Sequence, residues 1–154
     1  MSDLRDLYQE LILDHGRHPH NRRRIEGCAE AHAGCRRAEG HNPLCGDKLT
    51  LYLKTEGDRV ADLAFEGAGC AIFTASSSLL TDALRGKSLA EARTLLHDFL
   101  AMLTDAEADP NPERLGKLAV FAGVRGYPVR VKCAALAWRT LEAALDGAAQ
   151  ASTE

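Results

Sequence analysis

The sequence predicts an α+β fold, in which a small antiparallel β-sheet of about three strands packs with about five to six helices. Apolar and polar residues alternate over 49–54 and again over 61–65, which is the period of half-buried strands. The segment "EGDR" lies between these two runs, so they form a hairpin. Apolar stripes at helical spacing lie before and after this hairpin. Strands grouped in one part of a chain, with helices elsewhere, are typical of α+β domains.

The first predicted element is an amphipathic helix at the start of the chain, which Gly16 and Pro19 end. Its apolar residues recur three and four positions apart and therefore share one face; they are Leu4, Leu7, Tyr8, Leu11 and Ile12. Between this helix and the hairpin, residues 25–41 are expected to hold a short strand before the turn at Asn42 and Pro43.

Two helices are predicted directly after the hairpin. The first runs from Thr74 to Gly86, and we interpret the serines at 76–78 as capping residues of its first turn. Ser88 and Glu91 have the spacing of a capping box, which predicts the start of the second helix. The apolar residues that follow Ser88 form one continuous stripe, as in a helix that packs on a core.

The last part of the chain begins with a polar link that contains two prolines, "TDAEADPNPE". A short helical piece is expected around Leu115 and Leu118. Pro128 then suits a position at the first turn of a final helix. We predict one domain over 1–148, followed by a frayed C-terminal tail over 149–154.

Length and composition limit the possible functions. The chain has 154 residues, of which 45% are hydrophobic, so it can bury a core as a single domain. A net charge of −3 gives no reason to expect nucleic acid or an anionic membrane as a partner. The charged start lacks the apolar segment of an export signal, and no run approaches the ~20 apolar residues of a membrane span. We therefore expect a cytoplasmic protein with reduced thiols.

Three of the five cysteines lie at boundaries between predicted elements. Cys45 precedes the first hairpin strand, Cys70 lies between the second strand and a helix, and Cys133 lies near the start of the last helix. Backbone N–H groups at helix N-termini favour a thiolate over a thiol. With Asp47, these residues could provide the four ligands of a tetrahedral Zn²⁺ site. Their separation in sequence leaves the alternative open that each cysteine is a small buried hydrophobic residue.

Other residues have candidate roles near or apart from this site. Arg130 and Lys132 precede Cys133 and could balance the negative charge of three thiolates and a carboxylate, or guide docking. The segment "CAEAHAGC" places His32 between Cys28 and Cys35, which could form a second metal site, although reduced thiols are the simpler interpretation. A surface loop is the simplest interpretation of the histidines after the first helix, with metal binding as the alternative; they are His15, His18 and His20.

Three motifs, taken in order, resemble the SufU/IscU family of iron–sulfur cluster assembly proteins. They are "NPLCGD", "GAGCAIFTASSS" and "RVKCAALAW", and the resemblance extends over nearly the whole chain. In the scaffold branch of the family, a histidine precedes the third cysteine. Lys132 stands at that position here, Arg130 is present, and the segment from Cys70 to Cys133 is long. These features resemble the SufU branch.

The resemblance implies a zinc-dependent sulfur carrier. It implies Zn²⁺ held by Cys45, Asp47, Cys70 and Cys133, and a pyridoxal-phosphate-dependent cysteine desulfurase as the partner that donates a persulfide. In the family mechanism a histidine of the desulfurase replaces the first cysteine on zinc, which makes Cys45 the persulfide acceptor. Downstream iron–sulfur assembly proteins are the implied recipients. Whether this sulfurtransferase-type carrier counts as an enzyme stays open.

Two alternatives use the same ligands. One is a scaffold on which a [2Fe–2S] cluster is assembled and passed to apo-proteins; Lys132 disfavours it, because lysine is a poor replacement for an imidazole ligand. The other is a purely structural zinc domain, since closed four-ligand sites are the form that structural zinc takes.

Overall fold

The computed structural model describes residues 2–26, 28, 34–105, 112–147 and 150–152, with side chains from residue 9 onward in the first helix. The elements in chain order are α1 (Ser2–Arg17), β1 (Cys35–Asn42), β2 (Asp47–Glu56), β3 (Arg59–Ala68), α2 (Ala71–Leu84), α3 (Leu89–Thr104), α4 (Pro112–Leu115), the 3-10 helix η1 (Gly116–Val124), α5 (Pro128–Leu145) and β4 (Gln150–Ser152). The predicted α+β class is confirmed. None of the helices in these ranges has the length and apolar character needed to cross a membrane.

The sheet has four strands in the order β3-β2-β1-β4. The predicted hairpin is confirmed as β2 and β3, which pair antiparallel, and β1 pairs antiparallel with β2 on the other side. The sheet is mixed because β4 pairs parallel with β1. Residues 149, 153 and 154 of the predicted frayed tail over 149–154 lie outside the described part of the chain, while Gln150–Ser152 form this edge strand. The physical reason is that the free edge of β1 offers backbone groups to the returning chain.

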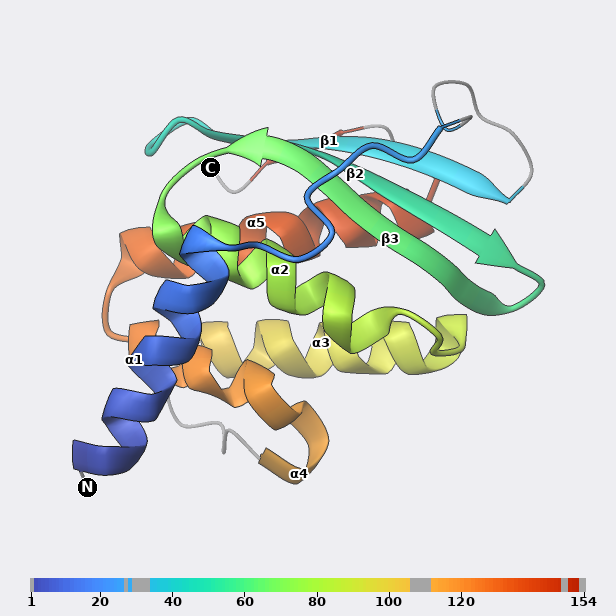
Figure 1. Cartoon of the computed structure of the whole chain (residues 1–154). Helices are drawn as coiled ribbons and strands as arrows, with labels where there is room; N and C mark the ends of the chain where they lie inside the picture. Colours follow the sequence, from blue (N-terminus) through green and yellow to red (C-terminus); the bar gives the residue numbers. More distant parts are fainter. Residues whose placement is uncertain (1, 27, 29–33, 106–111, 148–149, 153–154) are drawn as a thin grey trace.

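The helices lie on one face of the sheet (Figure 1). Helix α5 packs against β1 and β2, and α2 packs against α5 and α1. The strand residues that face the helices are apolar and fully buried; they include Leu51, Leu53, Leu63 and Phe65. From the first helix, Leu11 and Ile12 pack against this core as predicted, while the side chains of Leu4, Leu7 and Tyr8 lie outside the described part.

Helix α2 begins at Ala71, three residues before the predicted start at Thr74, and Cys70 is its N-cap. The serines at 76–78 are therefore not capping residues, which corrects the prediction. They lie in the middle of α2 and are fully buried, and each hydroxyl takes part in a hydrogen bond. Ser76 donates to the carbonyl of Ala134 at 2.6 Å and accepts from the indole of Trp138 at 3.0 Å. Ser76 thus connects α2 to α5 and Ser78 contacts His15 of α1, whereas Ser77 donates within α2 to the carbonyl of Phe73 at 2.9 Å.

Other predicted boundaries agree with the structure. The capping box of Ser88 and Glu91 is present at the start of α3. Pro128 occupies the first turn of α5, as predicted for the last helix. The short helical piece is α4 followed directly by η1, whose residue Leu118 is buried.

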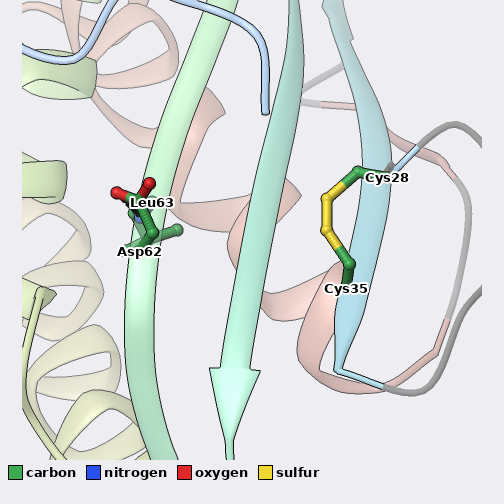
Figure 2. Close-up of a disulfide and its surroundings, with 4 residues drawn as sticks. All are labelled: Cys28, Cys35, Asp62 and Leu63. Atoms are coloured by element: carbon green, nitrogen blue, oxygen red, sulfur yellow. Dashed lines mark hydrogen bonds between the residues drawn. A yellow bond between two sulfur atoms is a disulfide. The ribbon is translucent and has the colours of Figure 1, made fainter. Parts of the chain in front are cut away.

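A small second apolar cluster lies on the opposite face of the sheet. It consists of Ile25, Cys28, Cys35, Tyr52 and Ala64. Cys28 and Cys35 form a disulfide with a Cα–Cα distance of 5.2 Å, well within the range that a disulfide bridges (Figure 2).

This disulfide corrects the interpretation of these cysteines as reduced thiols and removes both as thiolate ligands of a second metal site. The expectation of reduced thiols relied on the compartment alone, whereas the fold brings the two residues together at the start of β1. His32, the third residue of that predicted site, lies outside the described residues.

Candidate metal centre

The motif "NPLCGD" forms the tight connection between β1 and β2. The carbonyl of Asn42 accepts a hydrogen bond from the backbone N–H of Gly46 at 2.8 Å, and its side-chain oxygen accepts from the N–H of Leu44 at 3.2 Å. Gly46 has φ +75°, a conformation that glycine adopts without strain. The turn therefore exposes Cys45 at its tip and returns the chain so that Asp47 points into the protein.

The second motif positions Cys70 beside this turn. Its backbone N–H donates to Oδ1 of Asp47 at 3.1 Å, and its thiol accepts from the N–H of Phe73 at 3.4 Å as the N-cap of α2. Gly69 makes this approach possible, because a Cβ there would lie 2.4 Å from Oδ1 of Asp47. The cap hydrogen bond and the helix N-terminus both favour a negative charge on the Cys70 sulfur.

The third motif brings Cys133 to the same place from α5. Cys133 is the sixth residue of that helix and is buried, with its Sγ 3.4 Å from Sγ of Cys45. The buried amide of Asn42 donates to the Cys133 sulfur at 3.9 Å. The ligand atoms of Cys45, Asp47 and Cys133 all lie within 4.8 Å of one another.

The chemistry of this cluster fits a bound dication. Oδ2 of Asp47 is buried and is the one buried side-chain oxygen or nitrogen in the described ranges without a hydrogen-bond partner. An unpartnered buried oxygen is unfavourable unless a cation or water contacts it. Burial raises the pKa of the Cys133 thiol, and so do the neighbouring Asp47, Cys45 and Cys70. A cation at this point would reverse that effect and favour the thiolate.

The structure therefore brings the ligand atoms of Cys45, Asp47 and Cys133 together. Cys70 contacts this group through the hydrogen bond from its backbone N–H to Asp47. Cys70 is exposed and lies outside the group of three whose ligand atoms are within 4.8 Å, but its N–H contacts the carboxylate. Its inclusion as a ligand stays a prediction, as does the ligand role of the other three.

Arg130 is exposed and belongs, like Lys132, to the first turns of α5 before Cys133. The guanidinium carbon of Arg130 lies 4.6 Å from the centroid of the Tyr127 ring, over which it stacks. Lys132 is partly exposed. Their predicted role in charge compensation stays a prediction, and stacking on Tyr127 adds a contact that the sequence did not reveal.

Asn42 is a site residue that sequence reasoning did not single out. It closes the turn that carries Cys45 and contacts the sulfur of Cys133. The available signal was its position as the first residue of "NPLCGD", since asparagine commonly hydrogen-bonds the backbone two residues ahead.

The histidines after α1 do not all belong to a surface loop, which corrects the simplest interpretation. His15 lies within α1 and is only 3% exposed. Its ring centroid is 4.5 Å from that of His20, and Asp82 completes a cluster whose ligand atoms lie within 4.8 Å of one another. His18 is exposed and is not part of this cluster.

Comparison with known proteins agrees with this architecture. The NifU-like N-terminal domain family matches residues 7–134. The iron–sulfur cluster assembly scaffold protein IscU of Streptococcus pyogenes serotype M1 is 38% identical, over 98% of this chain and 90% of that protein. The zinc-dependent sulfurtransferase SufU of Bacillus subtilis (strain 168) is 36% identical, over 92% of this chain and 90% of that protein.

A solved structure gives the same result for the fold. The crystal structure of FiSufU from Fervidobacterium islandicum AW-1 superposes with a TM-score of 0.78 at 35% identity, covering 88% of this chain and 94% of that one. The predicted resemblance is thereby confirmed: the chain belongs to the SufU/IscU family of iron–sulfur cluster assembly proteins and carries its NifU-like N-terminal domain.

Proposed function

We propose that this protein accepts persulfide sulfur from a pyridoxal-phosphate-dependent cysteine desulfurase and relays it to downstream iron–sulfur assembly proteins. The observation that carries the proposal is the convergence of Cys45, Asp47 and Cys133 around a buried, unpartnered carboxylate oxygen, with Cys70 adjacent. A donor set of three sulfurs and one oxygen suits Zn²⁺. The relative named as a zinc-dependent sulfurtransferase supports the same metal.

In this proposal Cys45, Asp47, Cys70 and Cys133 hold zinc, which would keep the thiols deprotonated near neutral pH. Cys45 is the acceptor because it is exposed at the tip of a turn that Gly46 can reshape, whereas Cys133 is buried within a helix and the Cys70 sulfur is held as the N-cap acceptor of α2. The Cys45 thiolate attacks the terminal sulfur of the desulfurase persulfide. A new S–S bond forms on Cys45, the old S–S bond breaks, and the desulfurase cysteine leaves as a thiolate that takes up a proton.

The surface beside the cysteines supports docking of a partner. Of the four large hydrophobic side chains that are exposed in the described residues, three flank the site cysteines: Leu44 at 64%, Tyr127 at 54% and Val129 at 53% exposure. Arg130 is stacked beside them and adds a positive charge. Tyrosine and arginine are enriched in protein interfaces relative to the rest of the protein surface.

The test is a desulfurase assay with and without this protein. We expect stimulation of sulfide or alanine release, and loss of that stimulation in Cys45→Ser. The matched control is the Cys28→Ser, Cys35→Ser double variant, which changes cysteines outside the site and should retain stimulation. No stimulation by the wild-type chain, or full stimulation by Cys45→Ser, would contradict the proposal.

A scaffold for a [2Fe–2S] cluster is the second candidate, favoured by the curated relative at 38% identity that is named a scaffold protein. Metal analysis separates the two. A sulfur carrier should contain about one zinc per chain and no visible chromophore, because Zn²⁺ is d¹⁰ and colourless. A purely structural zinc domain would contain zinc and leave the desulfurase rate unchanged. A brown protein with two iron and two sulfide per site would instead establish the scaffold.

A further inference from the structure

We propose that His15, His20 and Asp82 form a second metal-binding site, for a divalent transition-metal cation such as Zn²⁺ or Co²⁺, separate from the cysteine cluster. Two imidazoles and one carboxylate are a donor set that binds such cations. Their ligand atoms already lie within 4.8 Å of one another.

The three side chains come from elements that the fold holds together. Helix α1 packs against α2, with His15 in the last turn of α1 and Asp82 near the end of α2. His20 follows α1 in a segment fixed by Asn21, whose φ is +58° and whose amide donates to Oγ1 of Thr81 at 3.0 Å. Both helices therefore direct their C-terminal ends toward the cluster, and helix C-termini favour a cation.

His15 is oriented before any metal binds. It is 3% exposed, and its Nδ1 lies 2.6 Å from Oγ of Ser78, which also accepts the backbone N–H of His20 at 2.8 Å. In the tautomer with Nδ1 donating to Ser78, the lone pair of Nε2 is free for a cation. A hydrogen bond on the second ring nitrogen is the usual companion of a ligating histidine.

His20 and Asp82 provide access from solvent. Their side chains are 51% and 39% exposed, and Nδ1 of His20 lies 2.5 Å from Oδ2 of Asp82. Two ligand atoms on one tetrahedral ion stand roughly 3.3 Å apart, so these exposed side chains need to separate by only about 1 Å. The cation would replace the proton shared by His20 and Asp82, and that proton would go to solvent. Three protein ligands leave a coordination position for water.

The site is distinct from the cysteine cluster. Ser78 follows Cys70 by eight residues on the same helix, which corresponds to about 12 Å along its axis. A metal bound at one site therefore shares no ligand with the other. The alternative is that His20 and Asp82 form an ion pair and nothing more.

A cobalt titration decides between a metal site and an ion pair. The full chain is first given one equivalent of Zn²⁺ and then titrated with Co²⁺, with absorption and the histidine ring resonances as readouts. We expect one bound Co²⁺ with d–d bands that lack sulfur-to-cobalt charge transfer, and changes at His15 and His20. Charge transfer from sulfur would report binding to the cysteines, so the proposed function and this site are tested separately.

Variants of two exposed ligands, of the buried Ser78 and of an exposed control histidine give the matched comparison. His20→Ala and Asp82→Asn should each weaken Co²⁺ binding at least about tenfold, and Ser78→Ala, which removes the hydroxyl that orients His15 and accepts the backbone N–H of His20, about 10- to 100-fold. His18→Ala changes an exposed histidine of the same segment and should bind like the wild type. No binding beyond the cysteine cluster, or equal weakening in His18→Ala and His20→Ala, would overturn the proposal.

Discussion

Gly69 is the residue whose missing side chain makes room for the Asp47 carboxylate. A Cβ at this position would lie 2.4 Å from Oδ1 of Asp47 and 2.5 Å from the ring of Phe73. Both neighbours are held in place, because Oδ1 accepts from the backbone of Cys70 and Phe73 is fully buried. Neither can move away without loss of the contacts that build the candidate metal centre.

We therefore predict that Gly69→Ala lowers the free energy of unfolding by about 1–3 kcal/mol, the usual cost of overpacking. It should also reduce the zinc content of the purified protein. The control is Gly123→Ala, because a Cβ there meets nothing within 4 Å. Urea unfolding and metal analysis of both variants provide the measurement. Equal behaviour of the two alanine variants would show that the space beside Asp47 is not limiting.

His15 is the residue whose burial should make stability depend on pH. Burial lowers its pKa from the ordinary 6.5, and the nearby His20 and Lys117 act in the same direction, against Asp82 and Asp14. The folded state therefore binds fewer protons than the unfolded state once the pH falls below about 6.5. The contribution of neutral, buried His15 to the free energy of unfolding is therefore fully present above about pH 6.5. It is lost as the pH falls toward the lowered pKa of His15 in the folded state.

The prediction is a loss of unfolding free energy between pH 7.5 and pH 5.5 that is smaller in His15→Gln than in the wild type. Measurement in the presence of a chelator keeps metal binding out of the comparison. His97→Gln, at an exposed position of α3, is the control and should keep the wild-type dependence. A pH profile of His15→Gln that is parallel to the wild type would exclude this residue as the source.

At the scale of elements, the disulfide fixes the segment that precedes β1. Cys28 and Cys35 are seven positions apart in the sequence, and closing a loop of this length in the unfolded chain corresponds to about 2–3 kcal/mol of stability at 25 °C in the chain-entropy model. Cys28 also packs with Tyr52 and Ala64 on the face of the sheet that the helices leave uncovered. The bond therefore holds this small cluster together.

The double variant Cys28→Ser, Cys35→Ser should lose about 2–3 kcal/mol of unfolding free energy relative to the oxidised wild type. Wild-type protein treated with a thiol reductant should lose a similar amount, while the double variant should not respond to the reductant. Urea unfolding with and without reductant gives all four values. A reductant effect of the same size in the double variant would assign the change to the other cysteines.

Across the whole molecule, the predictable features were those encoded by neighbouring residues. The alternation over 49–54 and 61–65 defines the hairpin, and the spacing of Ser88 and Glu91 defines the start of α3, because both signals are local. The convergence of Cys45, Cys70 and Cys133 depends on three distant segments. Sequence periodicity did not predict this convergence. Only the resemblance of the three motifs to the SufU/IscU family implied it.

The features that escaped prediction depend on contacts across long separations. The burial of His15 follows from its contact with Ser78, 63 residues away, which no local pattern contains. Likewise β4 is a strand only because β1 offers a free edge: the segment Gln150–Ser152 is too short to carry an alternating pattern. Ser76 was assigned to a helix start because serine favours caps, whereas its partners on α5 stabilise it inside α2.

Because the cysteine cluster is built from segments that meet only in the folded chain, metal binding and folding should be coupled. Cys45 belongs to the turn before β2, Cys70 to the start of α2 and Cys133 to α5. A ligand that binds only the folded state adds about 4 kcal/mol to stability at a free concentration 1,000 times its Kd. Removal of zinc by a chelator should therefore lower the unfolding midpoint of the wild type, measured by thermal denaturation. Cys133→Ala removes a buried proposed ligand of the cysteine cluster, so its midpoint should shift clearly less with zinc or chelator than that of the wild type, with any remaining shift coming from metal at His15, His20 and Asp82. An equal shift in wild type and Cys133→Ala would mean that the stabilising metal binds elsewhere in the chain.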